Sequence, residues 1–114
     1  MSVYVDEARY RYRRMVMFHM LADTPAELHA MADRIGVARR WYQRNASTPH
    51  YDIAKSKRQL ALAAGALELG RREVVEVIRR IREAVAAGTT EGRAWIEDCR
   101  GALDCTTDIP KIVG

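Results

Sequence analysis

A short stretch near the middle of the chain concentrates residue types that can do chemistry. His50, Tyr51 and Asp52 follow the turn residues Thr48 and Pro49, and Lys55, Lys57 and Arg58 come directly afterwards. Because an imidazole titrates near neutral pH, His50 is a candidate general acid or base. The basic residues can bind an anion, and the free N–H groups of a helix that starts there would add to this attraction. The stretch therefore predicts one edge of a site for an anionic ligand.

Two more positions carry candidate catalytic groups. Asp6 follows a predicted strand at residues 2–5, and strand ends are where α/β folds commonly place their functional groups. His19 interrupts the apolar run 15–21, which has the length of a buried strand. Each has a structural alternative, since Asp6 can begin a turn and His19 can be a satisfied core histidine. If the protein is an enzyme, we predict His50, His19 and Asp6 as its catalytic residues.

Aromatic and basic residues elsewhere add to the predicted ligand-binding set. Trp41 can stack on a flat ligand or lie in the core. His29 can border a cleft, although an ion pair with Asp33 one helical turn later is its simpler role. Aromatic surface suits a base, cations suit phosphate and carboxylates suit ribose hydroxyls. The predicted ligand-binding residues are His29, Arg40, Trp41, His50, Tyr51, Asp52, Lys55, Lys57 and Arg58.

The elements that must position these residues alternate between strand and helix patterns. Thr24, Pro25 and Glu27 form a strong helix start, and Gly36 ends that helix. Asp52 is a plausible N-cap for a helix over 53–64, which is the structural alternative to a role in the site. Strands are predicted at 2–5, 15–21 and 66–69, helices at 25–35, 53–64, 71–87 and from 90 to about 105, and either type at 37–43.

This pattern predicts a small single-domain α/β fold. We expect a short mixed sheet of about three to four strands, flanked by three to four helices. Residues 1–88 would form the compact α/β domain, and 89–114 a helical extension and tail packed on it. The length of 114 residues leaves room for one modest core.

Composition narrows the possible partners and compartment. The net charge of +4 and the pI of about 9.4 mildly favour acidic partners, such as nucleotides or phosphorylated metabolites. The sequence contains no apolar run that could span a membrane, and its N-terminus does not resemble a signal peptide. We therefore expect a cytosolic protein without a membrane partner, in which Cys99 and Cys105 stay reduced. A homo-oligomer is compatible with the sequence.

Known cofactor and metal motifs are missing from the sequence. It contains neither a Walker loop nor a G-x-G-x-x-G pattern, which argues against the common ATPase and dinucleotide folds. Without H-x-x-x-H or a pair of closely spaced cysteines, a metal site would have to be assembled from distant residues. The sequence therefore predicts no cofactor and assigns no metal ligands.

With these residues in place, the chain resembles an uncharacterised family of small proteins from actinobacteria and their phages, catalogued as a domain of unknown function. The resemblance covers roughly residues 1–70, and the segment 95–114 would be an extension to it. It implies no activity, so it identifies positions rather than a reaction. The matching pieces include Val3-Tyr4-Val5-Asp6, His19-Met20, Glu27-Leu28-His29, Ile35-Gly36, Arg40-Trp41, His50-Tyr51-Asp52-Ile53, Lys57-Arg58 and Gly65-Ala66.

Three functions follow from these observations, in order of preference. The first is a binding protein for a nucleotide-like or phosphorylated small ligand, and a phage version could sequester a host immune signal. The second is a hydrolase of such a ligand that uses histidine and aspartate as general acid and base. The third is a nucleic-acid-binding protein that uses the basic run 9–14, although the chain has no helix-turn-helix pattern and only a modest positive charge.

Overall fold

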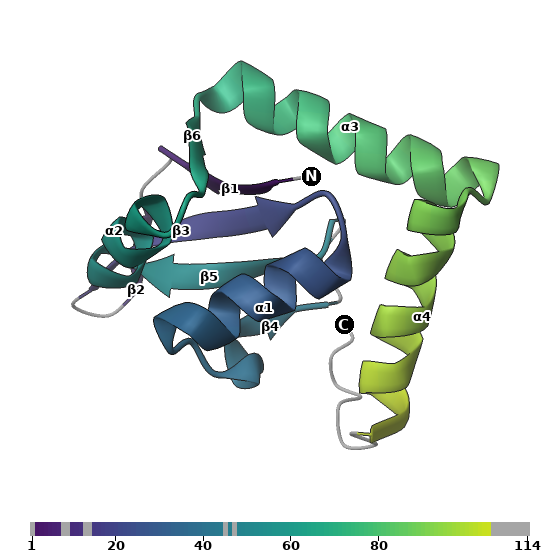
Figure 1. The fold of residues 1–114 in the computed structure, drawn as a ribbon, viewed down its shortest axis with the longest axis horizontal. Coiled ribbons are helices and arrows are strands. Elements are labelled where there is room, and N and C mark those ends of the chain that lie inside the picture. Colours follow the sequence, from purple (N-terminus) through teal and green to yellow (C-terminus); the bar gives the residue numbers. More distant parts are fainter. Residues whose placement is uncertain (1, 8–9, 13–14, 45, 47, 106–114) are drawn as a thin grey trace.

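A mixed β-sheet forms the centre of the computed structural model (Figure 1). The structure describes residues 2–7, 10–12, 15–44, 46 and 48–105, with the backbone alone at 10–12 and 100–105. The strand order is β4-β5-β3-β1-β6, and β2 pairs with β3 beside this path. The strands are β1 (Val3–Asp6), β2 (Tyr10–Tyr12), β3 (Met15–Ala22), β4 (Tyr42–Gln43), β5 (His50–Ala54) and β6 (Leu67–Leu69).

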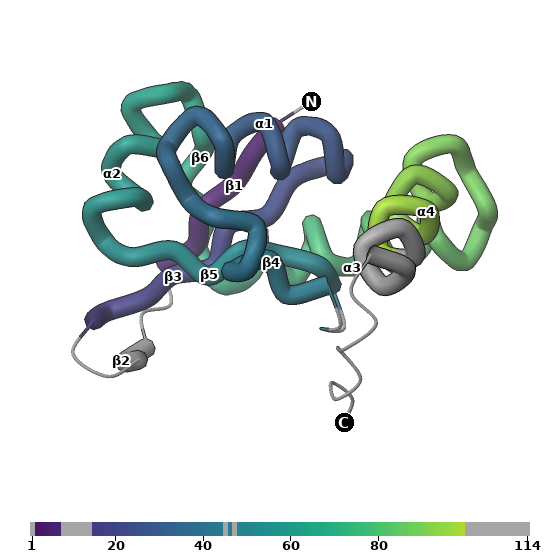
Figure 2. Tube along the Cα trace, turned by 90° about the horizontal axis from the view of Figure 1, so that it is seen from below, coloured from purple at the N-terminus to yellow at the C-terminus, as the bar shows by residue number. Residues whose placement is uncertain are grey.

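Helices α1 and α2 lie on one side of this sheet, while α3 and α4 meet beyond one end of it (Figures 1 and 2). The fold is thus a small α/β domain, as predicted, with more strands than the three to four expected. Among the described residues, none of the helices has the length and apolar character needed to cross a membrane. The helices are α1 (Pro25–Ile35), the short 3-10 helix η1 (Arg39–Trp41), α2 (Lys55–Ala63), α3 (Arg71–Ala87) and α4 (Thr90–Cys105).

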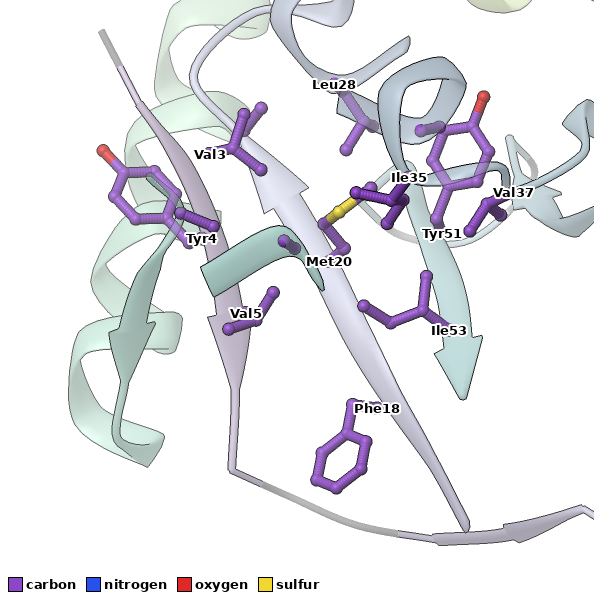
Figure 3. Close-up of a cluster of buried hydrophobic side chains, with 14 of the residues drawn as sticks. Val3, Tyr4, Val5, Phe18, Met20, Leu28, Ile35, Val37, Tyr51 and Ile53 are labelled. Carbon is purple, nitrogen blue, oxygen red and sulfur yellow. The ribbon is translucent and has the colours of Figure 1, made fainter. Parts of the chain in front are cut away.

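Strand register decides which side chains enter the core. Strand β3 pairs antiparallel with both β1 and β5, and β1 pairs parallel with β6. Val5, Met20 and Ile53, from three neighbouring strands, are each at most 1% exposed and lie in the core (Figure 3). Because side chains alternate along a strand, the residues next to these three point to the opposite face. Those neighbours are Asp6, His19 and Asp52.

Several predicted elements are confirmed. Strand β3 covers the apolar run, and α3 has the predicted bounds. At the start of α1, the Thr24 hydroxyl accepts a hydrogen bond from the Glu27 backbone N–H and donates one to the Glu27 carboxylate. Gly36 ends the same helix with φ 79°, in the left-handed region that glycine adopts without strain.

The prediction for residues 53–64 was wrong at its start. Residues His50–Ala54 form strand β5, and the helix begins only at Lys55. Asp52 therefore lies inside a strand, opposite His19 of β3, and the N-cap position belongs to Ala54. The capping signal was misleading because β3 and β4 offer hydrogen-bonding partners on both sides of β5, and such non-local pairing overrides local propensity.

Helix α4 joins the same hydrophobic core. Trp95 is 2% exposed, and its indole N–H donates to the Asp23 carbonyl at 3.2 Å. Thr89 caps this helix, because its hydroxyl accepts from the Gly92 backbone N–H. The division into 1–88 and an extension stays a prediction. The tail 106–114 lies outside the described residues, as do Arg9, Arg13 and Arg14 of the basic run.

Candidate functional site

Four predicted site residues meet on the sheet face opposite the α1–α2 core. They are Asp6 from β1, His19 from β3, and His50 and Asp52 from β5, and we call them the His–Asp row. Positions 19 and 52 face each other across the β3–β5 pair, and alternation along β5 puts His50 on the same face as Asp52. Residues 44 positions apart and more are thus assembled by sheet register alone.

Asp6 is the most buried residue of the row, and it holds the His19 imidazole. The Asp6 side chain is 5% exposed, and its Oδ1 accepts from the His19 backbone N–H at 2.9 Å. Its Oδ2 lies 2.6 Å from His19 Nδ1. A carboxylate only accepts, so Nδ1 carries a proton in this contact. The hydrogen bond to Asp6 raises the pKa of His19 above its ordinary value, against the opposing effect of burial.

The His50 imidazole is also held by a hydrogen bond at its Nδ1 atom. His50 Nδ1 lies 2.9 Å from the Thr48 carbonyl oxygen, which can only accept. In a neutral imidazole the other nitrogen, Nε2, then carries a lone pair. His50 Nε2 lies 3.3 Å from Asp52 Oδ1, and His19 Nε2 lies 3.9 Å from the same oxygen. Both Nε2 atoms therefore converge on one carboxylate oxygen.

The row is partly open to solvent. The side chain of His19 is 35% exposed, and those of His50 and Asp52 are each 18% exposed. The two imidazole rings meet edge to face, with centroids 4.9 Å apart. One ligand atom each from His19, His50 and Asp52 lies within 4.8 Å of the other two. Two histidines and a carboxylate are a donor set that divalent transition metals use.

A cleft adjoins the row at the edge of β5. It encloses about 220 Å³, and its lining includes four predicted ligand-binding residues: Arg40, Trp41, Asp52 and Lys57. Strand β4 covers β5 only as far as Tyr51, so the edge beyond that residue stays open towards η1. We call this the β5-edge cleft. Asp52 belongs to both the cleft and the row, which makes the two features one continuous site.

Lys55 and Arg58 lie elsewhere. Both line a separate cleft of about 300 Å³ together with Glu68. The Arg58 guanidinium donates to the Asp6 backbone carbonyl at 3.0 Å and to the Glu68 carboxylate at 2.5 Å, and it lies over the Phe18 ring. These contacts give Arg58 a structural role. The Glu68 carboxylate in the same cleft would weaken the binding of an anion by Lys55 and Arg58.

His29 and Tyr51 belong to a second polar cluster, which lies on the α1 side of the sheet. His29 Nδ1 lies 2.7 Å from the Tyr51 hydroxyl, and its Nε2 lies 3.0 Å from the Asp98 carboxylate of α4. The Tyr42 hydroxyl donates to the same carboxylate at 2.7 Å. Burial raises the pKa of both tyrosines, that of Tyr51 to about 12. We call these four residues the α4-docking cluster.

The predicted pairing of His29 with Asp33 was wrong. The Asp33 carboxylate instead accepts from the Arg39 guanidinium at 3.2 Å. His29 turns towards Tyr51 because that hydroxyl is buried and needs a partner, whereas the side chain of Asp33 is 64% exposed. Asp98 was not predicted as a site residue, and Thr48 was predicted only as part of a turn. The roles of Tyr42, Thr48 and Asp98 come from contacts made by the tertiary fold.

Comparison with known proteins identifies the family. Residues 3–81 match the family model described as protein of unknown function (DUF4031), and the chain belongs to that family. The match contains the whole His–Asp row and the β5-edge cleft, and it ends before α4. Neither the curated proteins nor the solved structures gave a match to this chain.

Proposed function

We propose that this protein is a hydrolase of a small phosphorylated, nucleotide-like ligand. The observation that carries the proposal is the convergence of two imidazole Nε2 atoms on Asp52, at 3.3 and 3.9 Å, beside the β5-edge cleft. Folding alone does not need this arrangement, because it lies on the partly exposed face of the sheet. Clusters of titratable groups with shifted pKa values are typical of functional sites.

The chemistry that we propose is activation of water by the row. With its Nδ1 proton held by Asp6, His19 presents Nε2 as the acceptor for a proton from an attacking water. The buried carboxylate then stabilises the imidazolium that forms, as the aspartate does in a Ser–His–Asp triad. The His19 imidazolium formed in this step can then pass that proton from Nε2 to the leaving oxygen, so the reaction needs no second proton donor.

The β5-edge cleft supplies the binding groups in this proposal. Arg40 and Lys57 offer cations for a phosphate, and Trp41 offers a flat surface for a base. The volume of about 220 Å³ suits part of a nucleotide rather than a whole one, so one end of the ligand would extend over the row. That position brings the phosphate next to His19 and His50.

The test is turnover of a nucleotide panel, followed by chromatography of the products. We expect a changed ligand with the wild-type protein and none with His19→Ala. Lys57→Ala should lower kcat/KM, because it removes a cation that binds the phosphate of the ligand. The matched control is Lys55→Ala, which removes a lysine from the separate cleft. Equal turnover by wild type and His19→Ala would refute the proposal.

A binding protein that does not turn its ligand over is the second candidate. It is favoured by the fact that Arg40, Trp41 and Lys57 line one cleft without any help from the histidines. A phage version of such a protein could sequester a host immune nucleotide. Recovery of unchanged ligand after heat release, with affinity lost in Trp41→Ala but kept in His19→Ala, would support this candidate over the hydrolase.

A further inference from the structure

We propose that His19, His50 and Asp52 form a binding site for one divalent transition-metal ion of the zinc type. The row has the composition of a catalytic zinc site, in which three protein ligands leave a position for water. The inference goes beyond the proposed function, because it concerns the ion and can be tested without any substrate.

The proton positions carry the argument. A neutral imidazole has one N–H, and the contact with Asp6 or with the Thr48 carbonyl uses that group in each ring. Both Nε2 lone pairs therefore face the anionic oxygen of Asp52. Lone pairs that converge on a carboxylate repel it unless a positive charge lies between them, either an added proton on each Nε2 or a bound metal ion. A bound divalent cation supplies that charge for both rings at once.

The distances agree with this assignment. With metal–ligand bonds of about 2.0–2.1 Å, the ligand atoms of a tetrahedral site lie about 3.3–3.4 Å apart. The His50 Nε2–Asp52 Oδ1 distance of 3.3 Å already has this value. The His19 Nε2–Asp52 Oδ1 distance is 3.9 Å, and the three ligand atoms lie within 4.8 Å of one another, so the His19 ring, whose side chain is 35% exposed, would move inward when the ion binds.

The groups behind the ligands also match those of known metal centres. Metal-binding histidines nearly always donate their other ring N–H to a carboxylate or a backbone carbonyl, which fixes the tautomer and the ring orientation. Asp6 does this for His19, and Thr48 does it for His50. The side chains of the three ligands are partly exposed, so water can reach the site. A water bound there would be acidified by the ion, so water activation would pass from His19 to the metal.

The experiment is titration of the chelator-treated full chain with Zn²⁺ by calorimetry and with Co²⁺ by visible spectroscopy. We expect one ion per chain and the absorption of a four-coordinate cobalt site. His50→Ala and Asp52→Asn should each weaken Zn²⁺ binding by more than about 100-fold. Asp33→Asn is the matched control, because it removes an exposed carboxylate of α1 and should bind Zn²⁺ as the wild type does.

A second measurement on the wild type guards against variants that fail to fold. In ¹⁵N spectra of the histidine side chains, Zn²⁺ should shift the Nε2 signals of His19 and His50 and leave those of His29 unchanged. Absence of stoichiometric binding, or Zn²⁺ shifts at His29 alone, would overturn the metal site. Metal binding without turnover would support the metal site and refute the hydrolase. Turnover in excess chelator, together with no stoichiometric Zn²⁺ binding, would refute the metal site and support the hydrolase.

Discussion

Substitution of Asp6 by Asn tests whether this carboxylate controls the His19 imidazole. The two side chains have the same shape, so the Asn oxygen can still accept from the His19 backbone N–H, as Asp6 Oδ1 does at 2.9 Å. The Asn amide nitrogen then replaces Oδ2, which lies 2.6 Å from His19 Nδ1. An amide nitrogen only donates, so Nδ1 must become the acceptor. The imidazole proton is therefore expected to move to Nε2, where it blocks the lone pair that faces Asp52.

The expected changes in stability and in metal affinity follow from the hydrogen bond that Asp6→Asn replaces. Replacing a hydrogen bond to a charged group, worth about 1.5–3 kcal/mol, by a neutral one, worth about 0.5–1.5 kcal/mol, lowers the free energy of unfolding by about 1–2 kcal/mol. Loss of a group that orients a metal ligand costs about 10–100-fold in metal affinity. This factor corresponds to about 1.4–2.7 kcal/mol. The change should thus be larger and more specific in metal binding than in stability.

Three measurements on the Asp6→Asn protein check this reasoning at neutral pH. The ¹⁵N signals of the His19 ring should show the proton on Nε2, while the rings of His29 and His50 keep their wild-type signals. Calorimetry should give weaker Zn²⁺ binding, and thermal unfolding should confirm a folded protein. If the His19 proton stays on Nδ1 and Zn²⁺ binds with wild-type affinity, Asp6 does not set the tautomer and the proposed architecture of the row is refuted.

Three further substitutions test how the fold supports the site. Trp95→Ala should lower the free energy of unfolding by about 3–5 kcal/mol in denaturant titration, because a buried indole is lost; a change below about 1 kcal/mol would place α4 outside the cooperative core. Gly92→Ala should lower the free energy of unfolding by about 1–3 kcal/mol in the same assay, since a Cβ there would lie 2.1 Å from the Ala84 carbonyl oxygen. Ile96→Ala should lower it less, because Ile96 is 39% exposed. Burial raises the folded-state pKa of Tyr51 from the ordinary 10.0 to about 12, so its neutral form contributes stability that is present below pH 10 and lost as the pH rises towards 12. The loss is on the order of 2–3 kcal/mol, and Tyr51→Phe should lack that part of the alkaline decline.

The parts of the fold that could be predicted are those with long local signals. The Thr24 cap, the apolar run of β3 and the helical stripe of α3 each decide their own element. Strand β4 has two residues and is too short to show a periodicity. Strand β5 was missed for another reason, because the sequence around Asp52 also satisfies the rules for a helix start. Its strand conformation depends on pairing with β3, which is distant in the sequence, and with the short strand β4.

The sequence indicated the residues of the candidate site, but it did not show which of them lie close together. Asp6, His19, His50 and Asp52 were all named from their residue types and their positions near element ends. The sequence could not show that one stretch would serve two faces of the sheet, because that follows from the strand conformation of β5. The metal ligands come from two strands that pair across the fold, so no spacing rule could find them.

The strand conformation of β5 also explains how a partly exposed row can be held in place. Tyr51 points away from the row, is 0% exposed and bonds to His29 in the α4-docking cluster. A register slip of one residue would exchange the faces of β5, moving His50 and Asp52 into the core and Tyr51 into solvent. Burial of Tyr51 makes that slip costly, so the register is fixed from the opposite side of the sheet. The α4-docking cluster thereby fixes the register of the strand that carries His50 and Asp52.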